Sequence, residues 1–291
     1  MNLSHLCQMA GHSVLFKPPP RPRATDWTAG PSNRFVRTID GFDVHCQLVL
    51  PFDRPTGIDQ YCAATDGVNG IILASHGNAE DLSTFHSYAQ YLADRLDMPV
   101  LTYDYPGYGY SSGHACTTDE NMFTACEAAL GFIVDNLKHT INDVIVFGKS
   151  IGTVPSVQLA SQPFMAQTGG LILVSPLASG VRCVVTPKYS DYMPRSIINS
   201  MDLLFGPSVH RIKDICCLLC VIHGTEDKVV PVSNAHELMA NCPTGSYYPP
   251  LFVVAGHNDI ESKHNGIFFD TLQHFIVTCR DKQRARRFLE G

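Results

Sequence analysis

The chain has 291 residues, which is enough for one large domain or two small ones with a substantial core. Its 45% hydrophobic and 16% charged residues are typical of a globular protein and exclude a largely disordered chain. The net charge of −6 provides no basic field, so we expect no nucleic-acid partner.

Eleven cysteines are scattered along the chain without the spacing of a disulfide framework. An odd, dispersed set favours a reducing compartment, so we expect a cytoplasmic protein. Cys216, Cys217 and Cys220 lie in an apolar run. We interpret them as small buried side chains of a strand, because no second ligand pair completes a tetrahedral zinc site. We expect no metal and no organic cofactor.

Residues 1–34 form a predicted N-terminal tail. Its first 16 residues lack the basic start of a secretory signal, but they carry an apolar stripe at helical spacing: Leu3, Leu6, Cys7, Ala10 and Val14. The stripe fits a membrane-surface helix acylated at Cys7, and equally a docked terminal helix or a frayed tail. Residues 17–23, KPPPRPR, predict a polyproline spacer. No stretch is long and apolar enough to cross a bilayer.

From residue 35 the chain alternates between apolar runs and amphipathic segments. Residues 35–50 predict a hairpin with Asp40-Gly41 as a two-residue turn, and a polar loop follows at 51–70. Continuous apolar runs predict buried strands at 70–75, 100–103, 144–147, 171–174, 216–222 and 251–254. Helical patterns lie between or after them at 82–96, at 122–137 behind a Thr117–Glu120 capping box, at 234–239 and at 267–279.

Buried strands that alternate with helices indicate an α/β protein with a mostly parallel central sheet and helices on both faces. Residues 177–205 fit neither the strand pattern nor the helix pattern, and we predict a short cap insertion there that covers an active or binding site. We therefore expect one domain at 35–281, followed by a basic C-terminal tail at 282–291.

Residues 143–160, DVIVFGKSIGTVPSVQLA, carry the strongest local signal. An apolar strand, the turn Gly148-Lys149-Ser150-Ile151-Gly152 and a helix-compatible segment follow one another, which is the context of a nucleophile elbow. The glycines leave room for a tight turn, and the helix N-terminus supplies free N–H groups near the serine. Ser150 is therefore the candidate nucleophile.

Two further polar loops follow predicted strands, and strand ends of a parallel sheet meet at one edge. Asp227 follows residues 216–222, and His257 follows residues 251–254. The order Ser150, Asp227, His257 is that of a hydrolase triad, in which the imidazole is the base and the carboxylate orients it. Glu226 remains the main alternative carboxylate, and Asp259 a weaker one.

An oxyanion hole needs two backbone N–H groups. We expect one from Ile151, the residue after the nucleophile, and one from Asn78 in the loop after residues 70–75, with Ala79 as the alternative. Asp81 is expected to cap the following helix. Lys149 is either a surface residue or a contact for an acidic substrate group.

Six motifs together resemble the α/β-hydrolase domain-containing protein 17 family of serine hydrolases. They are SHGNAED (75–81), YDYPGYG (103–109), FGKSIGT (147–153), SPLASG (175–180), HGTEDKVV (223–230) and GHNDIE (256–261). The resemblance covers roughly residues 35–280. It implies an α/β-hydrolase fold with a reduced lid, the triad Ser150, Asp227 and His257, and no cofactor.

Members of that family are regarded as thioesterases that remove palmitate from membrane-associated proteins and are anchored through acylated N-terminal cysteines. The resemblance thus implies an S-acylated protein or lipid-like acyl substrate and a peripheral membrane location. This chain has Cys7 alone where the family has a cluster, so a second signal is needed, either the apolar stripe or the basic residues Arg280, Lys282, Arg284, Arg286 and Arg287. A peptidase or general carboxylesterase with the same triad, and a non-catalytic binding module, remain alternatives.

Overall fold

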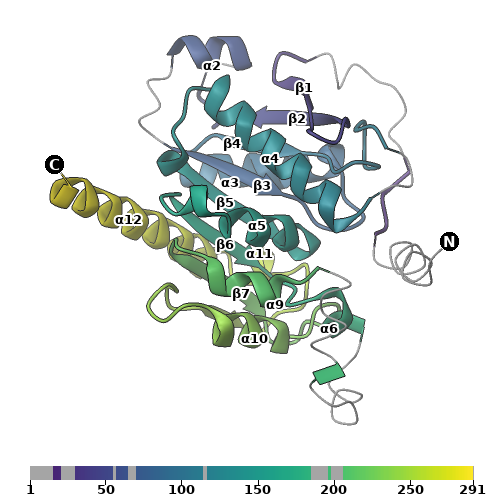
Figure 1. The fold of residues 1–291 in the computed structure, drawn as a ribbon, viewed down its shortest axis with the longest axis vertical. Helices are drawn as coiled ribbons and strands as arrows, with labels where there is room; N and C mark the ends of the chain where they lie inside the picture. The colour runs from purple at the N-terminus through teal and green to yellow at the C-terminus, as the bar shows by residue number, and fades with distance from the viewer. Residues whose placement is uncertain are drawn as a thin grey trace.

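The computed structural model describes residues 16–20, 30–54, 57–64, 70–113, 117–184, 196–197 and 206–290. An eight-stranded sheet runs through its centre in the order β1-β2-β4-β3-β5-β6-β7-β8 (Figure 1). The strands are β1 (Asn33–Arg37), β2 (Asp43–Val49), β3 (Ile71–Ser75), β4 (Val100–Tyr103), β5 (Val144–Lys149), β6 (Gly170–Val174), β7 (Leu219–Gly224) and β8 (Leu251–Val253). Strands β3 to β8 pair in parallel, whereas β1 and β2 are antiparallel additions at one edge.

Helices cover both faces of the sheet, as the sequence predicts. They are α2 (Ile58–Ala64), α3 (Leu82–Leu96), α4 (Asp119–Asp135), α5 (Thr153–Ala160), α6 (Gly180–Val184), α9 (Ser208–Arg211), α10 (Ser233–Asn241), α11 (Ile260–Lys263) and α12 (Asn265–Glu290). Side chains of α4, α5 and α10 pack with Leu73 and Val146 on one face. Side chains of α3 and α12 pack with Ile72 and Phe147 on the other. The central strands are therefore mostly apolar, because both of their faces are buried.

The predicted hairpin is present, but the two-residue Asp40-Gly41 turn is wrong. Register pairing ends at Arg37 opposite Asp43, and the Thr38 N–H donates to the Phe42 carbonyl at 2.9 Å. The loop is thus longer, and Gly41 supplies its left-handed position with φ of +90°.

Helix α4, predicted at residues 122–137, begins earlier than predicted, at Asp119. Its N-cap is Thr118, whose side chain accepts from the Asn121 N–H, whereas the Thr117 hydroxyl donates to the Pro106 carbonyl. The capping box is therefore Thr118–Asn121, one residue beyond the predicted pair. The last helix is also longer than residues 267–279, because it continues through the basic segment to Glu290 and projects beyond the sheet (Figure 1).

Several predicted segments lie wholly or partly outside the described residues. They include residues 1–15 with Cys7, part of the polyproline spacer, and most of the 177–205 insertion, of which 177–184 and 196–197 are described. In the part of the chain that is described, no helix is both long enough and apolar enough to cross a membrane.

Candidate active site

The turn after β5 has the strained geometry that its sequence predicts. Ser150 adopts φ of +52° at the start of a short 3-10 turn, Ser150–Gly152, which leads into α5. A Cβ on Gly148 would lie 2.7 Å from the Gly152 carbonyl oxygen, and a Cβ on Gly152 would overlap the Ser75 carbonyl. Both glycines are thus required for β5, α5 and β3 to approach so closely.

The structure brings Ser150, His257 and Asp227 into one hydrogen-bonded chain. His257 Nε2 lies 2.9 Å from Ser150 Oγ, and His257 Nδ1 lies 2.6 Å from Asp227 Oδ2. An ionised carboxylate accepts only, so Nδ1 carries a proton and Nε2 of the neutral ring can accept the serine hydroxyl. This is the arrangement in which an imidazole can take a proton from a serine.

Asp227 is held as a carboxylate. Its Oδ1 accepts the backbone N–H groups of Val229 and Val230, each at 2.8 Å. Burial by itself raises the pKa of Asp227, but hydrogen bonds from His223 and His257 and from the Val230 N–H outweigh burial and hold the pKa well below its usual range. A permanent negative charge therefore faces the histidine.

His223 contributes to this site in a way that the sequence did not reveal. It ends β7 as a fully buried side chain, and its Nε2 lies 2.9 Å from the Val230 carbonyl oxygen and 3.4 Å from Asp227 Oδ2. The prediction that this histidine shapes the loop by hydrogen bonding is compatible with the first contact. The second contact could not be read from spacing, because it depends on where the 225–230 loop turns back.

The other carboxylates near the predicted triad have different partners. Glu226 is exposed. Asp259 accepts the Gly256 N–H at 2.5 Å and forms an ion pair with Lys263 at 2.7 Å. Asp81 caps α3 as predicted, by accepting from the Ser83 and Thr84 N–H groups. Asp227 is thus the carboxylate on His257.

The loop after β3 lies against the elbow. A Cβ on Gly77 would lie 3.7 Å from Ser150 Cβ, so this loop borders the serine directly. The Asn78 side-chain oxygen accepts from the Tyr108 hydroxyl at 2.8 Å and from the Lys17 N–H at 2.8 Å, and Ala79 adopts φ of +57°. Asn78 and Ile151 are therefore placed on the two segments beside Ser150, and their role as oxyanion donors stays a prediction.

A small apolar cluster adjoins the carboxylate side of the site. Val154 in α5, Leu177 after β6 and Val230 after β7 are buried against one another, with Cys183 of α6 packed on them. Val154 is four residues from Ser150, and Val230 is the residue whose N–H binds Asp227. The cluster is buried, and its Val230 connects it to the loop that binds Asp227.

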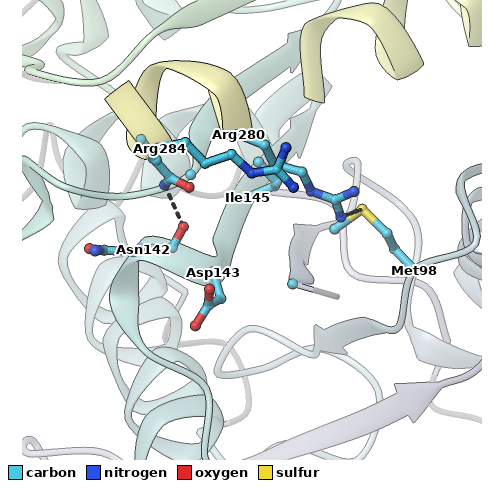
Figure 2. A pocket seen from close by; sticks show the side chains of 9 residues that line it. Met98, Asn142, Asp143, Ile145, Arg280 and Arg284 are labelled. Atoms are coloured by element: carbon cyan, nitrogen blue, oxygen red, sulfur yellow. Dashed lines mark hydrogen bonds between the residues drawn. The ribbon is translucent and has the colours of Figure 1, made fainter. Parts of the chain in front are cut away.

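A cavity lies at the edge of the sheet where the parallel strands begin, opposite to the edge that carries Ser150, Asp227 and His257. It has a volume of about 270 Å³ and is lined by Gly70, Met98, Asn142, Asp143, Ile145, Gly169, Arg280, Gln283 and Arg284. Figure 2 shows Arg280 beside Met98, to whose sulfur it donates at 3.6 Å. None of the described residues that line it is a serine, cysteine or histidine, so it offers no acyl-transfer nucleophile or base.

Both the sequence and the fold are similar to those of known proteins. A family model described as serine aminopeptidase S33 matches residues 66–203. The chain is 35% identical to α/β-hydrolase domain-containing protein 17C of Xenopus tropicalis over 217 residues, which are 74% of this chain and 64% of that protein. It is 35% identical to the human 17B protein over 70% of this chain and 65% of the relative. The chain therefore spans just under two thirds of the relatives that it matches.

The structure is also similar to that of an esterase from Pyrococcus furiosus, with a TM-score of 0.66 at 16% identity, covering 91% of this chain and 98% of the esterase. At that identity the likeness shows the fold alone. The sheet, the elbow and these matches place the chain among proteins of the α/β-hydrolase fold. Within that class its sequence is similar to the α/β-hydrolase domain-containing proteins 17B and 17C.

Proposed function

We propose that this protein is a serine hydrolase that cleaves acyl esters and thioesters through a covalent acyl-enzyme. The observation that carries the proposal is the unbroken chain from Ser150 Oγ through His257 to Asp227. A serine hydroxyl is a weak nucleophile at neutral pH, and a hydrogen-bonded imidazole within about 3 Å is the standard means of activating it.

The proposed reaction begins when His257 Nε2 takes the hydroxyl proton of Ser150 while Oγ attacks the carbonyl carbon. The carbonyl oxygen becomes an oxyanion, for which the backbone N–H groups of Ile151 and Asn78 are the proposed donors. Collapse of the tetrahedral intermediate breaks the ester or thioester bond, and the leaving oxygen or sulfur takes the proton from Nε2. His257 then deprotonates a water, which attacks the acyl carbon. The bond between that carbon and Ser150 Oγ breaks, Oγ takes the proton back from Nε2, and the acid is released.

Asp227 stabilises the imidazolium that forms in both half-reactions. Because its pKa is held well below the usual range, it stays ionised through the pH range in which a histidine base operates. It also fixes the ring through Nδ1, so that Nε2 faces the serine.

The preferred acyl group is proposed to be long and apolar, and the substrate an S-acylated protein, which makes the reaction a depalmitoylation. Support comes from the resemblance of the six motifs to the α/β-hydrolase domain-containing protein 17 family, whose members are regarded as thioesterases that remove palmitate, and from the similarity to the 17B and 17C proteins. An amide-cleaving peptidase of the same mechanism is the alternative that the matched aminopeptidase model favours.

Peripheral membrane contact through the N-terminal segment fits this substrate. Lys17 lies beside the loop that borders the nucleophile, because its backbone N–H donates to the side-chain oxygen of Asn78. The basic end of α12 instead lies at the opposite edge, at the cavity beside the starts of β3, β5 and β6. Attachment through residues 1–15 and an acylated Cys7 would bring the site toward acylated proteins at the membrane, whereas attachment through α12 would turn it away.

The test of the function is turnover of a matched palmitoyl thioester, palmitoyl oxygen ester and peptide amide by the wild type and by Ser150→Ala. Thioester turnover that is lost in the variant supports the proposal. Faster cleavage of the amide would identify a peptidase. If no substrate is turned over and a fluorophosphonate does not label Ser150, the protein is a binding module rather than an enzyme.

The attachment proposal has its own test. Cys7→Ser should lower the membrane-bound fraction and remove an acyl group detectable by mass spectrometry. An unchanged fraction with no acyl group on Cys7 would overturn it.

A further inference from the structure

Lys149 is not a surface residue, which was one of the two predictions for it, and its contact with an acidic substrate group stays a prediction. It is the last residue of β5, directly before the nucleophile, and its side chain is only 10% exposed. Its Nζ lies 4.5 Å from the centre of the Tyr88 ring and 4.0 Å from Glu80 Oε1. A largely buried ammonium group is costly unless a negative charge or an aromatic face compensates it, and here both are present.

Glu80 connects this ammonium group to the loop after β3. Its Oε2 accepts the Gly77 N–H at 2.7 Å, while Oε1 faces Lys149. Gly77 borders Ser150, so the glutamate fixes the backbone that leads into Asn78. The same carboxylate places a negative charge near the position where the oxyanion would form. Such a charge opposes the developing negative charge of the transition state unless a neighbouring cation balances it.

We infer that Lys149 and Glu80 form a charge-compensated brace that positions the β3 loop for catalysis at Ser150, an inference that rests on the proposed hydrolase function. Glu80 holds the Gly77 N–H and thereby the loop. Lys149 balances the negative charge of Glu80. The carboxylate can therefore bind the Gly77 N–H without weakening the stabilisation of the oxyanion. Both are positioning residues, because neither touches the reacting atoms.

Tyr88 extends the brace to the loop that carries His257. Its ring lies under Lys149, and its hydroxyl donates to Glu261 Oε1 at 2.6 Å. Glu261 is buried in α11, four residues after His257. The elbow, the β3 loop and the histidine loop are therefore linked through one set of side chains, which accounts for the burial of a lysine beside a nucleophile.

The experiment measures kcat and KM for a short, soluble p-nitrophenyl ester, which removes membrane effects. Lys149→Met should lower kcat by about 10- to 100-fold with KM within about two-fold, because the Glu80 charge is left unbalanced near the oxyanion. Glu80→Gln should cost a few-fold, since its amide oxygen still accepts from Gly77. Glu80→Ala should cost more than Glu80→Gln, because the Gly77 N–H loses its partner.

The decisive variant is the double substitution Lys149→Met with Glu80→Gln. Removing the carboxylate charge should restore kcat to within a few-fold of Glu80→Gln alone, a coupling that a purely structural role would not produce. Lys149→Arg keeps the charge and should retain most activity, and Lys213→Met, an exposed lysine in another segment, should match the wild type. Thermal melting of each variant shows whether it is folded.

Three outcomes would overturn the brace. In the first, the double variant has a kcat as low as that of Lys149→Met. In the second, Glu80→Gln and Glu80→Ala lower kcat equally. In the third, Lys149→Met retains the kcat of the wild type. Wild-type turnover that Ser150→Ala abolishes keeps the hydrolase function intact in each of these cases. An inactive wild type would overturn the function and the brace together.

Discussion

His223 Nε2 lies 3.4 Å from Asp227 Oδ2, the carboxylate oxygen that also receives the hydrogen bond of His257. The same nitrogen lies 2.9 Å from the Val230 carbonyl, which can only accept, so His223 carries its proton on Nε2. Two histidines therefore direct N–H groups at one buried carboxylate, and the ring of His223 also fixes the loop whose N–H groups bind the other oxygen.

The first prediction concerns this second histidine. His223→Leu removes a donor from Asp227, so the ring of His257 is held less firmly and kcat/KM for a soluble ester should fall roughly 10-fold. His223→Gln retains an N–H donor near the same position and should recover part of the loss. A pH profile of kcat/KM in both variants separates an altered base from a misfolded site. Equal activity of His223→Leu and the wild type would show that neither contact of His223 supports catalysis.

A matched pair of glycine substitutions tests the elbow geometry. Gly152→Ala places a Cβ into the Ser75 carbonyl and should destabilise the fold by more than about 2 kcal/mol or prevent expression. Gly131→Ala lies inside α4 with nothing within 4 Å of its Cβ, so it should stabilise the protein by about 0.5–1 kcal/mol. Urea unfolding measures both, and a tolerated Gly152→Ala would mean that the elbow is looser than described.

Asp104 gives a pH-dependent prediction. It is fully buried, its Oδ1 accepts the Leu82 N–H at 2.9 Å, and it faces His45 and His76 at 3.7 Å and 3.5 Å. Burial raises its pKa, but the two neighbouring histidines outweigh burial and the net pKa is lowered. Its folded pKa thus lies below its unfolded value of about 3.9.

A group whose pKa is lowered by folding stabilises the protein above its unfolded pKa, and that stability is lost as the pH falls toward the folded pKa. Asp104→Asn keeps the acceptor for Leu82 but removes the charge, so it should cost about 2–3 kcal/mol at pH 7. The difference from the wild type should be the same at pH 5.5 and should begin to shrink near pH 4. Urea unfolding at these three pH values measures it, and a difference that grows on acidification would contradict the assignment.

The sequence was most informative where local signals agreed. The structure begins and ends α3 at the predicted residues, because Asp81 caps its start and Asp97 takes a left-handed conformation after its end. The apolar runs located the central strands within two residues of their ends, except that β7 begins three residues later than predicted, since burial on both faces favours apolar side chains there.

Contacts between distant segments were not accessible in this way. The contact of His223 with Asp227 and the burial of Lys149 depend on how loops fold back, which no periodicity encodes. The extension of α12 was missed for another reason. Beyond Cys279 the helix faces solvent along most of its surface, so it has no apolar stripe and continues on intrinsic helix propensity.

The cysteines provide the last prediction, because their environments differ sharply. Of the trio interpreted as buried strand residues, Cys217 and Cys220 are buried, whereas Cys216 is exposed before β7 begins. Burial, with a smaller contribution from Cys279, raises the pKa of the Cys220 thiol to about 12, and burial likewise raises the pKa of Cys126 to about 12. A thiolate is the reactive form, so these two thiols should be inert in the folded protein.

Iodoacetamide at pH 8 should therefore modify Cys216 in the native protein, while Cys126 and Cys220 react only after denaturation. Peptide mass spectrometry over a time course measures the order, and Cys216→Ser should abolish the fast native phase at that peptide. Cys220 lies within β7, where it pairs with Ile172 of β6. Modification of Cys220 in folded protein at a rate similar to that of Cys216 would therefore require β7 to separate from its neighbouring strands. Such opening would also displace His223 at the end of the same strand, so ester turnover should fall in step with Cys220 labelling.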